Sequence, residues 1–507
     1  MQRMAKQRCN FPARQYSTCV ASPEPPTPSP GFSMTIRART KIVATVGPAC
    51  RSVEMLGKLI QAGVSVFRIN TAHGNEEQRN EVLRDIRTAS QQVGIPVGVL
   101  VDLAGPKIRL GELFADPTNC QPGQIYRFVK KEKPEAADEL TSTYEPILTE
   151  LSVGDSVMLA DGTVSMSVIG KAAGEVRCQV IGGGVIRSRQ GINLPGVKLS
   201  VASLTEADMA NAMWAARNEI DFVSLSFVRS HVNVLLLKEL LHAQHSKAMV
   251  IAKIEKREAL DHLTEIVTAA DGVMVARGDL GVEIDVAEIA VVQKRIVREC
   301  QLQGKPVIVA TQMLESMHKS RRPTRAEATD VANAILDGAD ACMLSGETAI
   351  GEFPVETVEM MSRIMLATEP LVSSTPHSDV AIAASDVHPI TYAAVIGASR
   401  IARELSAKIL VVATRGGGTC RLLSKQRGDI PVIGCSDTPA VLRKLTLFWG
   451  VTPQAGAPVH DGPELRAFID QWGREQKLIA KGDRVVFVTG TNFYPMAQNI
   501  LVIHEVE

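Results

Sequence analysis

Short apolar runs separated by amphipathic stretches recur along the first two thirds of the chain. Each run has the length of a buried parallel strand, and helical spacing of apolar residues follows most of them. This alternation predicts an α/β fold built on a (β/α)8 barrel of the TIM type, in which eight strands alternate with eight helices. The runs are Lys41–Val46, Val64–Ile69, Val97–Val101, Phe222–Phe227, Met249–Ile254, Gly272–Ala276, Pro306–Ala310 and Ala341–Leu344.

Polar side chains follow these runs at the point where each strand ends. The active site of such a barrel lies at the carboxyl ends of its strands, so we expect these side chains to gather there. They are Arg68, Asn70, Asp102, Ser226, Glu255, Asp279, Thr311 and Ser345.

Two consecutive runs end in a concentration of charge. Lys253 and Glu255 are two residues apart and therefore share a face of their strand, and the next run stops at Arg277-Gly278-Asp279. Two carboxylates suit a hard divalent cation, and the ammonium neutralises anionic oxygens that the metal does not reach. One Lys-x-Glu would favour a surface salt bridge. The recurrence of polar groups at several strand ends favours a metal and anion site instead.

The third and fourth runs are separated by residues 102–221, far more than a connecting loop and helix need. Short alternating stretches and turn pairs such as Asp161-Gly162 predict strands within this segment. We therefore expect an inserted all-β domain, hinged near Pro106 and Pro195-Gly196, that closes over the barrel as a lid. The expected strands are Gln124–Val129, Gly154–Met158, Asp161–Val168 and Glu175–Ile181.

After residue 370 a loose segment, Ser373–His388, precedes a second alternation of strands and helices, which predicts a C-terminal open α/β domain. Its expected elements are a helix from Thr391 and strands at Lys408–Ala413, Pro431–Gly434 and Arg484–Thr489. The predicted organisation is an N-terminal tail at 1–36, the barrel at 37–105 and 197–370, an inserted β-barrel lid at 106–196 and the α/β domain at 371–507.

Composition narrows the function classes. Lys and Arg total 55, as do Asp and Glu, so no global field attracts nucleic acid or a membrane surface. Nine scattered cysteines without a CxxC pair are typical of a reducing compartment, and no apolar run reaches membrane-spanning length. A cytoplasmic location is expected. Residues 1–33 are basic and proline-rich, which leaves open an organelle transit peptide, a disordered tail, or sequence upstream of a start at Met34.

Nine motifs, among them IAKIEKREAL (251–260), DGVMVARGDLG (271–281) and MLSGETAIGEFP (343–354), resemble in order and spacing those of pyruvate kinase, of the lysine-containing, K⁺-independent type. The resemblance implies the predicted architecture and a glycolytic transfer of phosphate from phosphoenolpyruvate to ADP, giving pyruvate and ATP. It also implies Mg²⁺ or Mn²⁺ as cofactor and a homotetramer. The motifs are TKIVATVGPA (40–49), FRINTAHG (67–74), DLAGPKIR (102–109), GINLPG (191–196), IAKIEKREAL (251–260), DGVMVARGDLG (271–281), KPVIVATQMLESM (305–317), RRPTRAEATDVANAILDGAD (321–340) and MLSGETAIGEFP (343–354).

The resemblance implies a role for each matched residue. Glu255 and Asp279 match the divalent-metal ligands, and Lys253 matches the lysine that faces the transferring phosphoryl group. The substrate carboxylate is expected on the backbone N–H groups of Arg277, Gly278 and Asp279. Thr311 and Ser345 match hydroxyls that bind substrate and protonate the enolate through a water relay, Arg68 and Arg109 match phosphate-binding arginines, and Asn70 and His73 match residues near the nucleotide. Two interpretations of Ser226 stay open, contact with substrate and packing at the end of its strand. Thr324 to Glu327 is interpreted as a helix capping box.

The chain departs from the family at the monovalent-cation site. Asn70, Asp102 and the Leu103 carbonyl remain, but Ala72 stands where relatives have a serine and Lys107 where they have a glutamate. One change removes an oxygen ligand and the other adds an internal cation. The expected outcome is activity without K⁺, and the alternative is that Lys107 is a plain surface lysine.

Two further departures concern the lid and regulation. Relatives have a lysine just before GINLPG that contacts the nucleotide phosphates from the lid. Here Gln190 stands in its place, so this contact is lost or has moved to Arg189. The turn Thr414–Thr419 resembles a sugar-phosphate effector loop but is equally typical of a plain strand–helix turn. The altered stretch VTGTNFYPMAQN (488–499) argues against fructose 1,6-bisphosphate activation and leaves a monophosphate effector, or none.

Two other functions remain to be distinguished. One is another metal-dependent barrel enzyme, such as an aldolase, against which the lid and the LPG hinge argue. The other is a silent relative that senses metabolites, which would have lost a metal ligand or the lysine, whereas Lys253, Glu255 and Asp279 are all present.

Overall fold

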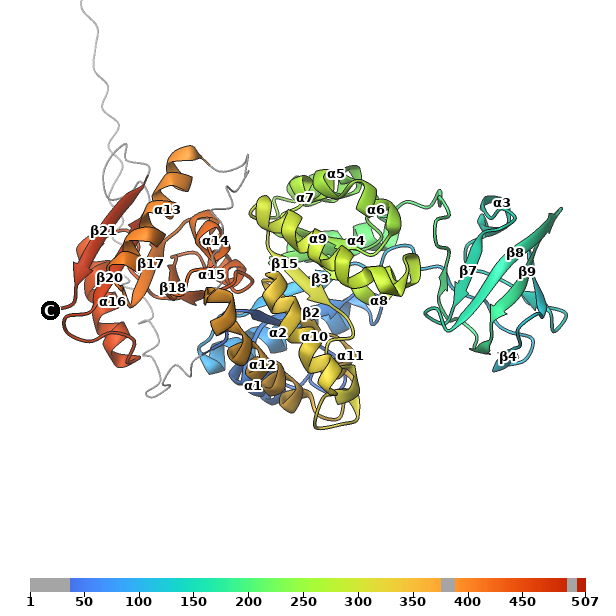
Figure 1. Cartoon of the computed structure of the whole chain (residues 1–507), viewed down its shortest axis with the longest axis horizontal. Coiled ribbons are helices and arrows are strands. Elements are labelled where there is room, and N and C mark those ends of the chain that lie inside the picture. The colour runs from blue at the N-terminus through green and yellow to red at the C-terminus, as the bar shows by residue number, and fades with distance from the viewer. Residues whose placement is uncertain (1–36, 375–387, 490–498) are drawn as a thin grey trace, which may run out of the picture. The chain divides into compact units, whose positions relative to one another are not determined.

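The computed structural model describes residues 37–374, 388–489 and 499–507 (Figure 1). The predicted N-terminal tail, most of the loose segment Ser373–His388 and residues 490–498 of the altered C-terminal stretch lie outside the described residues.

Eight parallel strands close into a barrel, as predicted. Their order around the barrel is β1-β16-β15-β14-β13-β12-β3-β2, so the chain visits neighbouring positions in turn apart from the long insertion between β3 and β12. The bounds are β1 Lys41–Thr45, β2 Val64–Asn70, β3 Gly98–Asp102, β12 Phe222–Leu225, β13 Met249–Ile254, β14 Gly272–Ala276, β15 Val307–Ala310 and β16 Ala341–Leu344. Each lies within two residues of its predicted run.

Helices surround the barrel and bury their apolar stripes against it (Figure 1). Thr324 and Glu327 form the predicted capping box of α10 (Arg325–Asp337), in which each side chain accepts the other residue's backbone N–H. The other helices of this part are α1 Val53–Ala62, α2 Glu76–Val93, α4 Glu206–Arg217, α5 His231–Ala243, α6 Arg257–Asp261, α7 Leu263–Ala269, α8 Arg277–Glu283, η1 Val286–Glu288, α9 Ile289–Leu302, η2 Glu315–His318, α11 Gly346–Ala349 and α12 Pro354–Ser374.

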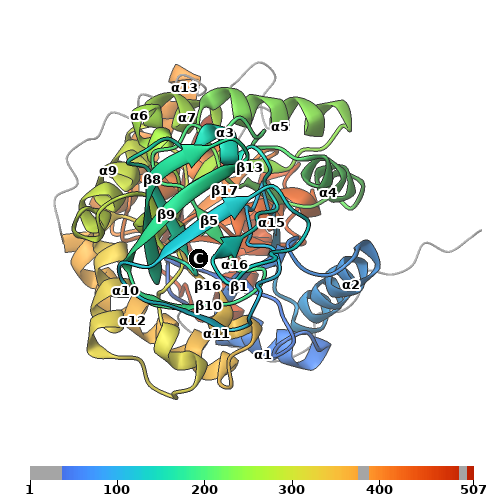
Figure 2. The same ribbon diagram turned by 90° about the vertical axis from the view of Figure 1, so that its right-hand side faces the viewer.

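The inserted domain is all-β, but its strands form two sheets and not the single closed barrel predicted for the lid. A six-stranded sheet has the order β11-β7-β8-β9-β5-β6, and β10 pairs with β4 separately. Figure 2 shows β8, β9 and β5 of the larger sheet side by side. The chain passes from the larger sheet to the smaller one at the glycine run 182–184. Only glycine fits at Gly183, because a Cβ there would come within 2.7 Å of the Cys120 carbonyl oxygen. The bounds are β4 Thr118–Cys120, β5 Ile125–Val129, β6 Glu139–Leu140, α3 Ile147–Glu150, β7 Ser156–Leu159, β8 Val164–Ala172, β9 Glu175–Gly182, β10 Gly184–Ile186 and β11 Ile192–Asn193.

The C-terminal domain is an open α/β sheet of order β19-β18-β17-β20-β21, in which only β21 is antiparallel. The predicted helix and three strands are confirmed, whereas β19 and β21 were not predicted. The bounds are α13 Pro389–Glu404, β17 Ile409–Ala413, α14 Gly418–Lys425, β18 Val432–Cys435, α15 Pro439–Leu445, β19 Val451–Gln454, α16 Gly462–Glu475, β20 Arg484–Thr489 and β21 Ile500–Glu505.

An aspartate stands immediately before three of the barrel strands. Asp221, Asp271 and Asp340 each accept the backbone N–H at or next to the start of a neighbouring strand, at 2.8–2.9 Å. These carboxylates therefore fix the strand register at the end of the barrel opposite the predicted site.

Two of these aspartates also bind cations from the C-terminal domain. Arg443 donates to Asp221 at 2.7 Å, and Lys425 and Arg427 both contact Asp340, whose side chain is fully buried. Burial lowers the pKa of Lys425 to about 8, and Asp340 opposes that shift, so the lysine remains charged at neutral pH. The two domains thus meet through buried ion pairs and not through apolar packing alone.

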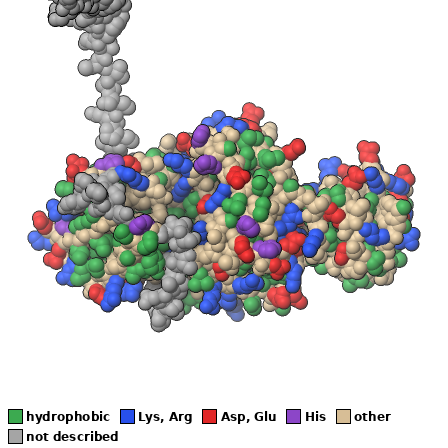
Figure 3. Space-filling view, turned by 90° about the horizontal axis from the view of Figure 1, so that it is seen from above, with side chains coloured by type: hydrophobic (Ala, Val, Ile, Leu, Met, Phe, Trp, Pro, Cys, Tyr) green, Lys and Arg blue, Asp and Glu red, His purple; other side chains and the backbone are tan. Residues whose placement is uncertain are grey.

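The surface of the face shown in Figure 3 mixes acidic and basic side chains, in keeping with the balanced composition. Among the described residues, no helix is both long and apolar enough to cross a membrane. All seven described cysteines are unpaired and buried, and burial raises the pKa of every one of these thiols.

We expect Asp340→Ala to lower the free energy of unfolding by about 3–5 kcal/mol, because it leaves two buried cations without their carboxylate. Thermal and urea unfolding of the whole chain measure this. Glu54→Ala is the control, since Glu54 forms only an exposed pair with Lys58 within its own helix, and it should change stability by less than about 0.5 kcal/mol. Equal stability of the two variants would contradict the structural role of Asp340.

Candidate active site

Lys253 lies at the centre of the predicted site. Its ammonium nitrogen is 2.8 Å from Glu255 and 3.9 Å from Asp279, and it donates to the Ser226 hydroxyl at 3.3 Å. Burial favours the neutral amine, but the carboxylates of Glu255, Asp102 and Asp279 outweigh it and raise the pKa of Lys253 above its ordinary value. The amine is therefore held as a cation, and Ser226 contacts it directly.

Glu255 is fixed and almost fully enclosed. One carboxylate oxygen accepts the backbone N–H of Phe227 at 2.6 Å, and the residue is 1% exposed. Burial raises the pKa of Glu255, and the neighbouring charge of Asp279 raises it further, while Lys253 opposes both effects. Glu255 and Asp279 carry two negative charges and Lys253 carries one positive charge. The remaining negative charge favours binding of a hard divalent ion. Asp279, with 43% of its side chain exposed, gives such an ion access from solvent.

Arg68 is clamped beside this group. Its Nε and Nη2 donate to one oxygen of Asp102 at 2.9 and 2.5 Å, and Nη1 donates to the Thr45 hydroxyl at 3.1 Å. The other Asp102 oxygen accepts the Ser224 hydroxyl at 2.5 Å. The guanidinium is therefore oriented by three strands, β1, β2 and β3, and the Asp102 carboxylate is satisfied on both oxygens.

Thr311 has a backbone conformation that is rare for a β-branched residue, with φ of +68°. Its hydroxyl accepts the Gly278 backbone N–H at 2.8 Å and donates to the Ala310 carbonyl at 2.6 Å. The Arg277 guanidinium stabilises this turn. It donates to the Thr311 carbonyl at 2.9 Å and pairs with Asp330 at 2.7 Å. Sequence reasoning assigned Arg277 only through its backbone and missed this side-chain function.

Ser345 follows β16 and presents a hydroxyl to the interior. Its Oγ is shielded from solvent and makes no hydrogen bond to any described residue. Its backbone N–H donates to Glu347 at 2.7 Å, and Thr348 of the same turn donates to the Thr45 carbonyl at 2.9 Å. The serine is thus held rigidly while its hydroxyl remains available for a ligand or water.

The predicted nucleotide residues are more open and are not all brought together. The Asn70 side-chain oxygen accepts the Ala72 backbone N–H at 3.1 Å, and His73 is exposed in the turn that follows. Arg109 lies in the inserted domain, where it donates to the Arg189 carbonyl at 3.0 Å. Among the described residues, its hydrogen bonds go to Thr143 and Arg189 of the same domain, and it forms an isolated β-bridge with Gly191.

Lys107 and Arg189 also belong to the inserted segment. Lys107 is exposed, and its side chain lies alongside Gly191, 3.6 Å from where a Cβ would stand. Arg189 has φ of +65° and pairs with Glu112 at 2.6 Å, so its guanidinium is engaged at the surface.

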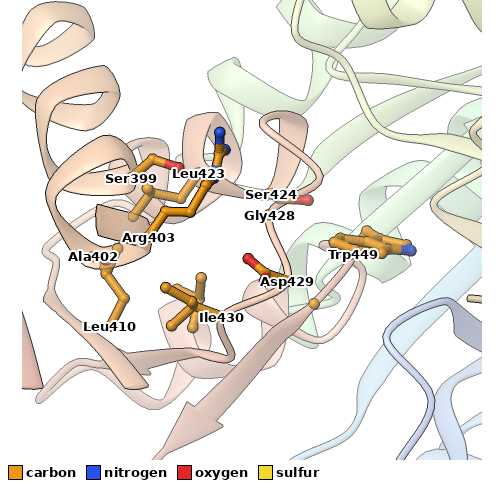
Figure 4. Close-up of a pocket in the computed structure, with 12 residues that line it drawn as sticks. Ser399, Ala402, Arg403, Leu410, Leu423, Ser424, Gly428, Asp429, Ile430 and Trp449 are labelled. Atoms are coloured by element: carbon orange, nitrogen blue, oxygen red, sulfur yellow. The ribbon is translucent and has the colours of Figure 1, made fainter. Parts of the chain in front are cut away.

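The C-terminal domain offers two polar features apart from this site. The turn after β17 is closed by a bond from the Gly417 N–H to the Thr414 hydroxyl at 2.9 Å, and Gly417 has φ of +86°. A small cavity of about 20 Å³ lies among Ser399, Arg403 and Trp449 (Figure 4). That volume holds one water molecule and no metabolite.

Comparisons with known proteins identify the family of this chain. The family model described as pyruvate kinase, barrel domain, matches residues 37–358, and the model described as pyruvate kinase, alpha/beta domain, matches residues 392–504. The first match includes the barrel and the inserted domain, and the second covers the C-terminal α/β domain. These matches exclude the alternative of an aldolase.

Individual relatives give the same result. The pyruvate kinase of Geobacillus stearothermophilus is 39% identical over 460 residues, covering 90% of this chain and 78% of that protein. The pyruvate kinase of Mycobacterium intracellulare is 40% identical over 458 residues, covering 89% and 95%. Among solved structures, a pyruvate kinase from Cryptosporidium parvum superposes with a TM-score of 0.86 at 34% identity, covering 93% of this chain and 96% of that one.

Proposed function

Because this chain belongs to the pyruvate kinase family, it transfers the phosphoryl group of phosphoenolpyruvate to ADP, and we propose how its own residues divide that reaction. The observation that carries the proposal is the Lys253 ammonium, placed between Glu255 and Asp279 at 2.8 and 3.9 Å. Phosphoryl transfer depends mainly on positioning and on neutralising charge, which is what such a cluster supplies.

Glu255 and Asp279 would hold the divalent cation that the family requires. Mg²⁺ usually takes one or two protein carboxylates and completes its shell with substrate oxygens and water, and Mn²⁺ accepts the same donors. The bound cation supplies charge neutralisation for the oxygens of the donor and the acceptor.

Lys253 faces the phosphoryl group during its transfer and the enolate oxygen from which that group departs. Its raised pKa keeps it charged throughout the working pH range, so it stabilises negative charge and does not act as a base. Arg68, held by Asp102 and Thr45, presents its guanidinium to the phosphate oxygens.

The substrate carboxylate would bind at the start of α8. There the backbone N–H groups of Arg277, Gly278 and Asp279 follow the end of β14, and glycine permits close approach. The Gly278 N–H donates to the Thr311 hydroxyl, so Thr311 marks the position of an acceptor that a substrate carboxylate oxygen would share or replace.

Protonation of the enolate carbon is assigned to the hydroxyls that follow β15 and β16. The hydroxyls of Thr311 and Ser345 have pKa values too high to deliver a proton alone, so they would hold a water that relays it. The unpartnered Oγ of Ser345 supports that role, since an ordered water would satisfy it.

The nucleotide would bind between the barrel mouth and the inserted domain. Asn70 and His73 supply contacts from the barrel, and Arg109 supplies a phosphate contact from the lid. Because the hydrogen bonds of Arg109 to described residues stay within the inserted domain, that phosphate contact would form on lid closure. Arg189 would replace the missing lid lysine only by leaving Glu112.

Independence from K⁺ follows from the state of the residual monovalent site at Asn70, Asp102 and the Leu103 carbonyl. Asp102 already accepts three hydrogen bonds, from Arg68 and Ser224, and Ala72 offers no side-chain oxygen. The ammonium of Lys107 would supply the positive charge from the lid side. We also propose a homotetramer and a cytoplasmic location, by analogy with the family. For regulation the alternatives are a monophosphate effector at Thr414–Thr419 and no effector.

We expect Lys253→Met to lower kcat by about 10³-fold or more, because it removes the cation that faces the transferring group. Pyruvate formation coupled to lactate dehydrogenase measures this, and circular dichroism checks the fold. Lys58→Met is the matched control, since Lys58 is exposed on α1 and should leave kcat unchanged. Near-normal turnover by the Lys253 variant would refute the assignment.

Asp102→Ala should reduce kcat/KM for phosphoenolpyruvate about 10–100-fold, because Arg68 loses two charge-assisted hydrogen bonds and its orientation. Steady-state kinetics with varied phosphoenolpyruvate measure this. Asp261→Ala, at an exposed position on α6, is the control. Matching values of kcat/KM in the two variants would show that Asp102 does not orient Arg68.

In buffers free of Na⁺ and K⁺, with ionic strength held by a bulky organic cation, wild-type activity should change less than about twofold on adding K⁺. Lys107→Glu should lower activity about tenfold or more without K⁺ and regain it with K⁺, because the internal ammonium is gone. A strong K⁺ requirement in the wild type would overturn the proposal, as would a K⁺-indifferent variant of full activity.

A further inference from the structure

A second group of metal-ligating side chains lies outside the site described above. Glu315 and His318 stand at the two ends of η2, and Glu347 lies in α11. Residues three apart on a 3₁₀ helix eclipse each other, so Glu315 and His318 share one face. One carboxylate oxygen from each glutamate and one imidazole nitrogen lie within 4.8 Å of one another.

Glu347 is a buried carboxylate that lacks a cation. Its side chain is fully buried, and its oxygens accept the backbone N–H groups of Leu314 at 3.2 Å and Ser345 at 2.7 Å. Within the described ranges, no Lys or Arg forms an ion pair with it. Burial raises its pKa, and the nearby charge of Glu315 raises it further. Buried carboxylates are normally paired or bound to a metal, so this environment calls for a positive charge.

The His318 ring points a free nitrogen into the same space. Its Nε2 is shielded from solvent and makes no hydrogen bond to a described residue, although Glu315 Oε1 is 3.5 Å away. The ring is seated against Gly346, where a Cβ would come within 2.4 Å of Nε2. The absence of a side chain at Gly346 therefore creates the room that the imidazole occupies.

We propose that Glu315, His318 and Glu347 bind a divalent transition metal of the Zn²⁺ type. Three protein ligands with water in a fourth position form the open type of zinc site, and Zn²⁺ accepts both imidazole nitrogen and carboxylate oxygen as donors. An imidazole ligand selects Zn²⁺, Co²⁺ or Ni²⁺ over Mg²⁺, which prefers oxygen. Glu315 has 58% of its side chain exposed, so the ion enters from its side.

The bound ion ties together two segments of the active site. η2 follows the turn that carries Thr311, and α11 follows Ser345 directly. The site shares no residue with the Glu255 and Asp279 pair, so the two metals are held independently. Binding would stiffen the loops that hold the two hydroxyls and therefore couples transition-metal level to the active site.

Metal titration of the full chain tests the proposal. Chelator-treated protein is kept in saturating Mg²⁺, which occupies the catalytic carboxylates, and is then titrated with Co²⁺ by visible absorbance and with Zn²⁺ by calorimetry. We expect one equivalent to bind and to raise Tm by about 2–4 °C at excess metal.

Variants locate the ion. His318→Gln should weaken binding at least about tenfold and abolish the Co²⁺ absorbance, and the more exposed Glu315→Gln should weaken binding with the fold unchanged. His242→Gln, an exposed histidine in the last turn of α5, is the matched control and should bind like the wild type. Turnover with Mg²⁺ in zinc-free buffer should be the same for His318→Gln and wild type.

Two results would overturn the proposal. One is the absence of Co²⁺ and Zn²⁺ binding in saturating Mg²⁺, which would show that these three side chains hold no transition metal. The other is wild-type affinity in both His318→Gln and Glu315→Gln, which would place the ion elsewhere.

Discussion

The active site depends on one buried ammonium among carboxylates. Lys253 is held as a cation by Glu255, Asp279 and Asp102, and its charge in turn keeps Glu255 from being an isolated buried anion. Neither partner is stable in this enclosure alone, since an unpaired buried charge is strongly unfavourable. The charges of this cluster come from the ends of β3, β13 and β14, and the end of β12 contributes the Ser224 hydroxyl and the Phe227 N–H that bind two of the carboxylates. The other groups that we propose as catalytic lie around this cluster.

The two ends of the barrel use aspartate differently. At the carboxyl ends of the strands, Asp102 and Asp279 face the reaction space and pair with groups that would touch substrate. At the amino ends, Asp221 and Asp340 accept strand N–H groups and bind arginine or lysine from the C-terminal domain. The proposed catalytic groups and the attachment to the C-terminal domain therefore lie at opposite ends of the barrel.

Much of this arrangement was predictable from the sequence. Eight apolar runs located the barrel strands to within two residues, and the rule that parallel strands end at one rim placed Lys253, Glu255 and Arg68 together. The rest needed coordinates. The Arg277 guanidinium reaches the Thr311 turn and Asp330 through the fold, which no local pattern reveals. Strand β19 contains Pro453, which hides it from a propensity argument, and the split of the inserted sheet depends on a backbone approach at Gly183.

The buried cysteines have a consequence for how this enzyme meets oxidants. All seven described thiols are enclosed, and burial keeps them protonated at neutral pH, so the reactive thiolate form is scarce. Peroxides and alkylating reagents reach such sulfur atoms only when the surrounding segment opens. The labelling rate at Cys342 in the barrel, compared with Cys178 in the inserted domain, therefore reports the local opening of each domain separately.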